Sequence, residues 1–316
     1  DGARVFEGKV KGFEILQEKP TIPGMPSLYG GGETLVVTLE DEISKVQVDL
    51  YYSVYDELDA IARRAVIKNN ADTPLVLDRA YSFSLDLPAG SYKVITQYGA
   101  HMRERTPEVT PLMHGIMSVD SKRGATSLHS SCFMALAAKD ADEESGDVYG
   151  FNLIYSGSFR LTAEQSPYDM VRVLGGINDF DFSWKLLPGE SFYTPEAAMV
   201  YSGKGLGAMS RTFHDLYRGY IINKRFVNAV RPIVINNWEA TYFNFDIPKL
   251  CSIIDTVKDS GIDMFVLDDG WFGRRDSDRS SLGDWTVNKD KLKGDLSALI
   301  DYVHNAGMKF GLWFEP

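Results

Sequence analysis

The sequence predicts a multidomain protein in which a large antiparallel β-sandwich is followed by the beginning of a parallel α/β domain. Three observations lead to this fold class. Apolar and polar residues alternate with a period of two through the first two thirds of the chain, which is typical of strands that bury one face. The period becomes helical near Gly205. Beyond that point short apolar strands alternate with helices, as they do in parallel α/β domains.

The first two thirds of the chain predict short strands separated by turns. Alternation is clearest over residues 34–39 and 46–52, and further strands are expected over 81–87, 151–156 and 171–174. Turn-forming residues punctuate these runs at Asn69 to Asp72, at Pro88 to Gly90 and at Pro188-Gly189. Short strands at such spacing indicate an antiparallel sandwich.

A connecting helix is predicted after Gly205, because Met209, Phe213 and Leu216 recur at helical spacing in a segment that ends near Ile222. The pattern divides the chain into a sandwich domain over residues 1–204, a linker helix within 205–229 and an α/β part over 230–316.

The α/β part predicts three strands, over residues 233–235, 264–267 and 310–314, with a helix after each of the first two. The first helix has Asp246 as its N-cap and Pro248 in its first turn, and it ends before Gly261. The second ends before Gly307. Three such units do not close an eight-stranded barrel, which takes roughly 250 residues. The sheet is therefore either small and open or the start of something longer.

Composition excludes several classes of function. The 316 residues are 44% hydrophobic, which is enough for a large core, and no stretch approaches the roughly 20 apolar residues of a membrane-spanning helix. Asp and Glu number 44 against 33 Lys and Arg, for a net charge of −11. Such a charge repels phosphate backbones and anionic lipids, so neither nucleic acid nor a membrane is an expected partner.

The cysteines predict neither a disulfide framework nor a zinc site. Only Cys132 and Cys251 are present, and no paired ligand motif accompanies them. Two free thiols in a reducing compartment are expected, and together with the absence of an Asn-x-Ser/Thr sequence they favour a cytoplasmic protein.

Chemistry in parallel α/β domains gathers at the carboxyl ends of the strands. Here each end carries a Trp next to a carboxylate: Trp238 precedes Glu239, Asp268-Asp269 precedes Trp271, and Trp313 lies near Glu315. Aromatic planes stack on the C–H face of a sugar, and carboxylates accept hydrogen bonds from its hydroxyls. The strand ends therefore suit a carbohydrate.

A purely structural interpretation stays open for these residues, in which Trp238 and Trp313 fill the end of the sheet and the two Asp residues cap the next loop. Asp268-Asp269 is harder to explain in this way, because adjacent like charges repel where the strand should be buried.

After Asp269 comes a long segment, from Gly270 to about Gly294, that has little periodicity, and loops of that length are often functional. Its charged residues are interpreted as a solvated, mutually paired surface. The segment holds Arg274, Arg275, Asp276, Asp278, Arg279 and Trp285.

Four segments of the α/β part closely resemble the bacterial α-galactosidases of glycoside hydrolase family 36. They are residues 231–243 (RPIVINNWEATYF), 266–275 (VLDDGWFGRR), 281–285 (SLGDW) and 307–316 (GMKFGLWFEP). The resemblance continues upstream at residues 20–26, 148–151, 155–157, 180–184 and 213–217, so it covers essentially the whole chain. It departs at 127–133, where the sequence reads SLHSSCF and the family often has His, Asn and Pro before the Phe.

The resemblance implies a β-supersandwich followed by the first three βα units of a (β/α)8 barrel, truncated here. It also implies that galactose is bound by Trp238, Asp268, Asp269 and Trp313, with the two Asp residues on the O4 and O6 hydroxyls. No catalytic residue is expected within the chain, because the family's nucleophile and acid/base would lie beyond Pro316. No metal or organic cofactor is implied.

We therefore expect part of a retaining α-galactosidase that releases terminal α-linked galactose from melibiose- or raffinose-type oligosaccharides, and that forms a homo-oligomer when intact. The chain alone is expected to be inactive. The alternatives are a catalytically silent carbohydrate-binding fragment and a structural fragment that mediates oligomerisation. Within the enzyme class, an α-N-acetylgalactosaminidase or a galactosyl transferase of the same fold is also possible.

Overall fold

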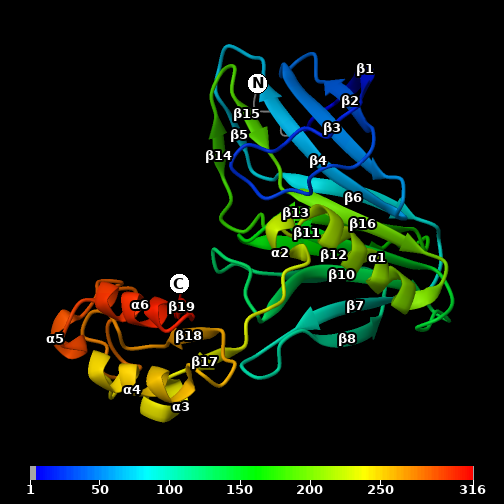
Figure 1. Ribbon diagram of the computed structural model, residues 1–316. Coiled ribbons are helices and arrows are strands. Elements are labelled where there is room, and N and C mark those ends of the chain that lie inside the picture. Colours follow the sequence, from blue (N-terminus) through cyan, green and yellow to red (C-terminus); the bar gives the residue numbers. More distant parts are fainter. Residues whose placement is uncertain (1–4, 316) are drawn as a thin grey trace. The chain divides into compact units, whose positions relative to one another are not determined.

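The computed structural model describes residues 5–315 (Figure 1). The chain divides into two compact units, residues 1–223 and residues 224–316, each with a hydrophobic core. In the described part of the chain, no helix is both long enough and apolar enough to cross a membrane.

The first unit is built on an antiparallel sheet of ten strands. In spatial order they are β1 (Lys9–Leu16), β2 (Thr34–Glu40), β3 (Val46–Tyr55), β4 (Ala60–Asn69), β16 (Glu196–Ser202), β11 (Val148–Ile154), β10 (Ser130–Ala138), β7 (Tyr92–Tyr98) and β8 (Thr106–Pro111), with β15 (Ser191–Tyr193) paired to β4. The predicted antiparallel architecture is confirmed.

Two smaller sheets complete this unit. One contains β12 (Phe159–Gln165), β13 (Val171–Ile177) and β6 (Tyr81–Leu87), and the other pairs β14 (Trp184–Leu186) with β5 (Leu75–Leu77). A further strand, β9 (Gly115–Asp120), lies against β12.

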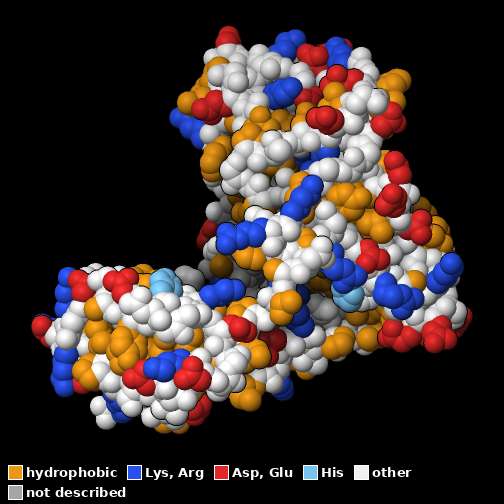
Figure 2. All heavy atoms as spheres, in the orientation of Figure 1, with side chains coloured by type: hydrophobic (Ala, Val, Ile, Leu, Met, Phe, Trp, Pro, Cys, Tyr) orange, Lys and Arg blue, Asp and Glu red, His pale blue; other side chains and the backbone are white. Residues whose placement is uncertain are grey.

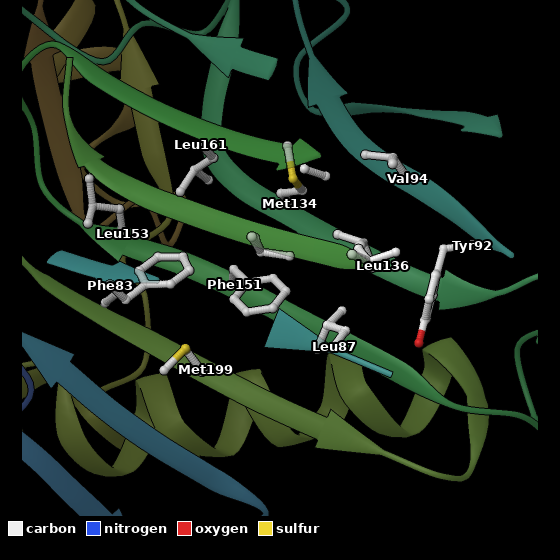
Figure 3. Packing of buried hydrophobic residues seen from close by; sticks show 14 of the residues in the cluster. Phe83, Leu87, Tyr92, Val94, Met134, Leu136, Phe151, Leu153, Leu161 and Met199 are labelled. Atoms are coloured by element: carbon white, nitrogen blue, oxygen red, sulfur yellow. The ribbon is translucent and has the colours of Figure 1, made fainter. Parts of the chain in front are cut away.

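The large sheet buries both of its faces at its centre, and β10 shows how the sequence achieves this. Met134 and Leu136 point into a core shared with the three-stranded sheet, where Phe83 stacks on Phe151 at 5.5 Å between ring centroids (Figure 3). Ala135 belongs to a second core on the opposite face. Successive side chains of a strand point to opposite faces, so a strand buried on both sides is apolar at nearly every position.

The second core is closed by α1 (Gly205–Tyr220), which lies against β16 and β11 (Figure 1). It buries Met209, Phe213 and Leu216, three of the residues whose spacing predicted the helix. The expected linker segment 205–229 thus contains α1, which packs within the first unit, and the short α2 (Lys224–Val227) of the second. The three-part division at residues 204 and 229 stays a prediction.

The second unit has a parallel three-stranded sheet, β17 (Val234–Asn236), β18 (Met264–Leu267) and β19 (Lys309–Leu312), in that spatial order. Besides α2, its helices are α3 (Trp238–Thr241), α4 (Ile247–Val257), α5 (Lys289–Leu292) and α6 (Leu296–Asn305). Strand, helix, strand, helix, strand is the predicted order, and α4 packs against α6.

The predicted start of α4 is confirmed. Asp246 is its N-cap and accepts a 3.0 Å hydrogen bond from the Lys249 backbone N–H, and Pro248 lies in the first turn. The helix ends at Val257, earlier than the predicted stop at Gly261, and Gly261 lies in the following turn with a φ of 86°, a conformation that favours glycine.

Two further details differ from the sequence prediction. The first strand starts one residue later than predicted, at Val234. The third ends at Leu312 instead of residue 314: Trp313 still donates its backbone N–H to Leu267, but Phe314 is 51% exposed.

Candidate functional site

The carboxyl ends of β17, β18 and β19 lie along one edge of the parallel sheet, because Asn236 is in register with Val266, and Leu267 with Leu312. The segments that follow these strands therefore share that edge. They carry the four residues expected to hold a sugar: Trp238, Asp268, Asp269 and Trp313.

Asp268 is held at this edge by hydrogen bonds from the neighbouring strand end. Its Oδ2 accepts the Asn236 side-chain amide at 2.5 Å, and its Oδ1 accepts the Asp269 backbone N–H at 2.7 Å. The Asp268 backbone N–H donates to Oδ1 of the fully buried Asn237 at 2.8 Å. Side chains of the β17 end thus fix both the backbone and the carboxylate of Asp268.

Asp269 has a different environment, because it is buried and paired with the buried Arg275. Arg275 Nε lies 2.9 and 3.1 Å from the two carboxylate oxygens, and the Arg275 terminal NH2 lies 2.8 Å from Oδ2. Hydrogen bonding to Asp269 raises the pKa of the Arg275 guanidinium above its usual value. The guanidinium therefore compensates the second of the two adjacent carboxylates.

The two tryptophans lie among other aromatic rings and are half-buried. Trp238 meets Tyr242 and Phe243 edge to face, at 5.2 and 4.9 Å between centroids. Trp313 stacks with Phe272 at 6.3 Å, and its carbonyl accepts the Trp271 indole N–H at 3.1 Å. Each tryptophan ring keeps exposed area on which a ligand can stack, and each also packs against neighbouring aromatic rings. The sugar-binding and the purely structural interpretations therefore both have a structural basis.

The segment 270–294 contains more structure than its sequence indicated. It includes α5 and an isolated bridge between Phe272 and Val287. The interpretation as a solvated charged surface is confirmed for the exposed side chains of Arg274, Asp276, Asp278 and Arg279. It is wrong for Arg275, whose side chain is 4% exposed. Trp285 is half-buried against Trp271, Phe272 and Trp313.

Sequence reasoning did not identify the positioning groups around the predicted ligand-binding residues. Asn236 and Asn237 were visible only as polar residues at a strand end, and Arg275 as one of several loop charges. A usable signal for the two asparagines was present, because a side-chain amide both donates and accepts hydrogen bonds, and two of them at a strand end can bind polar groups of the neighbouring strand.

The described residues contain no group of three or more His, Cys, Asp and Glu side chains arranged to hold a metal ion. Both cysteines are free, Cys132 buried and Cys251 half-buried. In the segment that departs from the family pattern, Ser127 Oγ lies 3.2 Å from His129 Nδ1, and Arg123 contacts the same nitrogen at 2.9 Å.

Comparison with known proteins gives matches along the whole chain. A family model described as the glycosyl hydrolase family 36 N-terminal domain matches residues 1–187, and one described as melibiase matches residues 191–316. Curated relatives include α-galactosidase AgaA of Geobacillus stearothermophilus, at 45% identity, and α-galactosidase Mel36A of Lactobacillus acidophilus, at 43%. Both alignments cover 100% of this chain and 44% of the relative.

Solved structures agree. The family 36 α-galactosidase AgaB of Geobacillus stearothermophilus superposes with a TM-score of 0.94 at 46% identity, over 100% of this chain and 44% of that one. A variant of AgaA in complex with raffinose gives a TM-score of 0.93 at 46% identity, over 99% and 44% of the two chains. The chain therefore spans less than half the length of the relatives it matches.

Proposed function

Because the chain belongs to glycoside hydrolase family 36, we propose that the protein containing it is a retaining α-galactosidase that releases terminal α-linked galactose from melibiose- or raffinose-type oligosaccharides. The observation that supports this proposal is the shared sheet edge, because two tryptophans and two adjacent carboxylates follow the ends of β17, β18 and β19 along it. Among the similar structures, variants of AgaA are complexes with raffinose and stachyose, which supports substrates of this class.

In this proposal the chain recognises and orients galactose. Trp238 and Trp313 stack on the apolar face of the ring, and Asp268 and Asp269 accept hydrogen bonds from its hydroxyls, in agreement with the roles that the family resemblance implies. A retaining mechanism also needs a nucleophile and an acid/base about 5–5.5 Å apart. We assign neither role to a residue of this chain.

We also propose that the protein is cytoplasmic and forms a homo-oligomer. Two free cysteines that form no disulfide support a reducing compartment. Apolar residues on the outer strands support association, since Val10, Phe13 and Ile15 of β1 are all exposed.

The direct test is the activity of the longest natural protein that includes this chain. We expect it to cleave nitrophenyl α-galactoside and raffinose with retention of anomeric configuration, and to act far more slowly on the matching α-glucoside. The matching N-acetylgalactosaminide and an added sugar acceptor test the two other enzyme activities. Binding of galactose without turnover of any of these substrates would instead favour a silent carbohydrate-binding protein.

A further inference from the structure

One segment contacts two of the predicted sugar-binding residues at once. Residues 270–294 lead from the end of β18 towards α6, and from this segment Arg275 forms an ion pair with Asp269 while Trp285 packs against Trp313. The segment lies beside the proposed site without supplying any of its four predicted ligand-binding side chains.

Arg275 is held in place from several directions. One of its terminal NH2 groups donates to the Ser280 carbonyl at 2.9 Å, and its own carbonyl accepts the Lys291 ammonium at 2.8 Å. Its backbone N–H donates to Phe272 at 3.2 Å. The Ser280 contact holds the guanidinium against its own turn, and the other two contacts hold the Arg275 backbone against Phe272 and α5.

Asp269 needs such a partner for a physical reason. It is buried and directly follows another carboxylate, and a buried charge without compensation is strongly unfavourable. An arginine fork fixes the plane of a carboxylate as well as its charge. A carboxylate has about four acceptor positions, so the fork leaves positions that can accept sugar hydroxyls.

We propose that Arg275 is a positioning residue, which sets the plane of the Asp269 carboxylate and compensates its charge, and thereby makes recognition of galactose hydroxyls depend on the folded conformation of residues 270–294. This inference rests on the proposed function. It adds a residue that does not touch the sugar but determines how well the sugar is recognised.

The test combines the substitution Arg275→Lys with removal of single hydroxyl groups from the substrate, in the longest natural protein that includes this chain. The effect of the substitution on kcat/KM is compared between the galactoside and its deoxy analogues. Lysine keeps the charge but loses the fork, so we expect kcat/KM for nitrophenyl α-galactoside to fall about 10-fold, by the loss of one charge-assisted hydrogen bond. One of the two analogues, the 4-deoxy or the 6-deoxy galactoside, lacks the hydroxyl that donates a hydrogen bond to Asp269. For that analogue the same substitution should change kcat/KM little.

Arg274→Gln is the matched control, because it removes an exposed guanidinium one residue away. It should lower kcat/KM for the galactoside and for both deoxy analogues by less than 2-fold. If Arg275→Lys does not fold, Lys291→Met takes its place, since Lys291 anchors the Arg275 carbonyl. A smaller loss with the same dependence on the hydroxyl is expected.

The outcomes separate this inference from the proposed function. An equal loss on the galactoside and on both deoxy analogues, with wild-type activity intact, would show a merely structural role and overturn the inference alone. So would kcat/KM unchanged by Arg275→Lys. Absence of wild-type activity on every α-galactoside would overturn the proposed function, and this inference with it.

Discussion

Two neighbouring carboxylates at the end of β18 differ in their surroundings. Asp269 is buried and paired with Arg275, whereas Asp268 is only half-buried and accepts neutral amide groups from Asn236 and from the backbone. Charge compensation therefore acts on Asp269, and Asp268 is the more accessible acceptor. The two residues should respond differently when their charge is removed.

In the intact protein, Asp268→Asn and Asp269→Asn should each lower kcat/KM for α-galactosides about 10- to 100-fold, because each loses a charge-assisted contact worth roughly 1.5–3 kcal/mol. Only Asp269→Asn should also clearly lower stability, by about 1–3 kcal/mol, since it leaves the buried Arg275 without a charged partner. Steady-state kinetics and urea unfolding measure the two effects. If both variants kept galactoside efficiency and the preference for galactose over glucose, the pair would be structural.

The thiols provide a prediction about pH. Burial raises the pKa of Cys132 to about 12, and burial also raises the pKa of the half-buried Cys251. The thiolate is the reactive form, so the native protein should react slowly with iodoacetamide at pH 8, whereas both thiols should react once the chain is unfolded.

The sign of the accompanying change in stability follows from the raised pKa. Below about pH 8.5 Cys132 is protonated in the folded and unfolded chains, so it contributes no pH dependence. Above that value the unfolded chain loses the proton and the folded chain keeps it, so stability falls as pH rises towards 12. Cys132→Ser should abolish this part of the alkaline loss. Rapid reaction of Cys132 with iodoacetamide in the native protein at pH 8 would contradict the raised pKa of this thiol.

At the scale of elements, the packing of α1 on the large sheet depends on one glycine. A Cβ at Gly150 of β11 would lie 2.5 Å from Phe213 and 3.0 Å from the Met209 sulfur. The helix is close to the sheet because this position has no side chain.

We expect Gly150→Ala to destabilise the first unit by about 1–3 kcal/mol through overpacking. Gly219→Ala is the matched control, because Gly219 lies in α1 and an added Cβ there meets nothing within 4 Å. It should be neutral or stabilise by up to about 1 kcal/mol through helix propensity. Denaturant midpoints of the two variants test this, and equal midpoints would show that α1 can shift without cost.

Regular elements were predictable because their signals are local. The cap at Asp246 and Pro248 in the first turn of α4 act within a few residues of sequence, and they placed the start of that helix correctly. The end of β19 was not predictable, because continued apolar sequence at Phe314 does not show where strand pairing stops.

The arrangement of the candidate site was predictable only in part, because only some of its contacts follow from local sequence. Strand ends bring Trp238, Asp268 and Trp313 to one edge by topology, so their proximity follows from the order of elements. The burial of Arg275 depends on how residues 270–294 fold back on Asp269. Its sequence neighbours are exposed charges, and nothing in their pattern separates it from them.

At the scale of the molecule, the two units bury their apolar surface differently. In residues 1–223 the large sheet is covered on both faces at its centre, by the three-stranded sheet and by α1. In residues 224–316, β17 and β19 each pair only with β18 among the described residues. Figure 2 shows apolar side chains at the surface of both units. The exposed apolar residues of the second unit include Ile233 just before β17, Val234 at its start and Phe314 just after β19.

Expressed as a separate polypeptide, residues 1–316 should therefore self-associate. An outer strand with unpaired backbone groups and exposed apolar side chains is a template for pairing with another chain. Val234→Lys places a charge on β17, where Val234 is 50% exposed, and should reduce light scattering and shift sedimentation towards smaller species. Residues 1–223 alone should unfold in one cooperative transition and associate less than residues 1–316. If residues 1–316 were instead a monodisperse monomer unaffected by Val234→Lys, the unpaired strands of the second unit would not cause association.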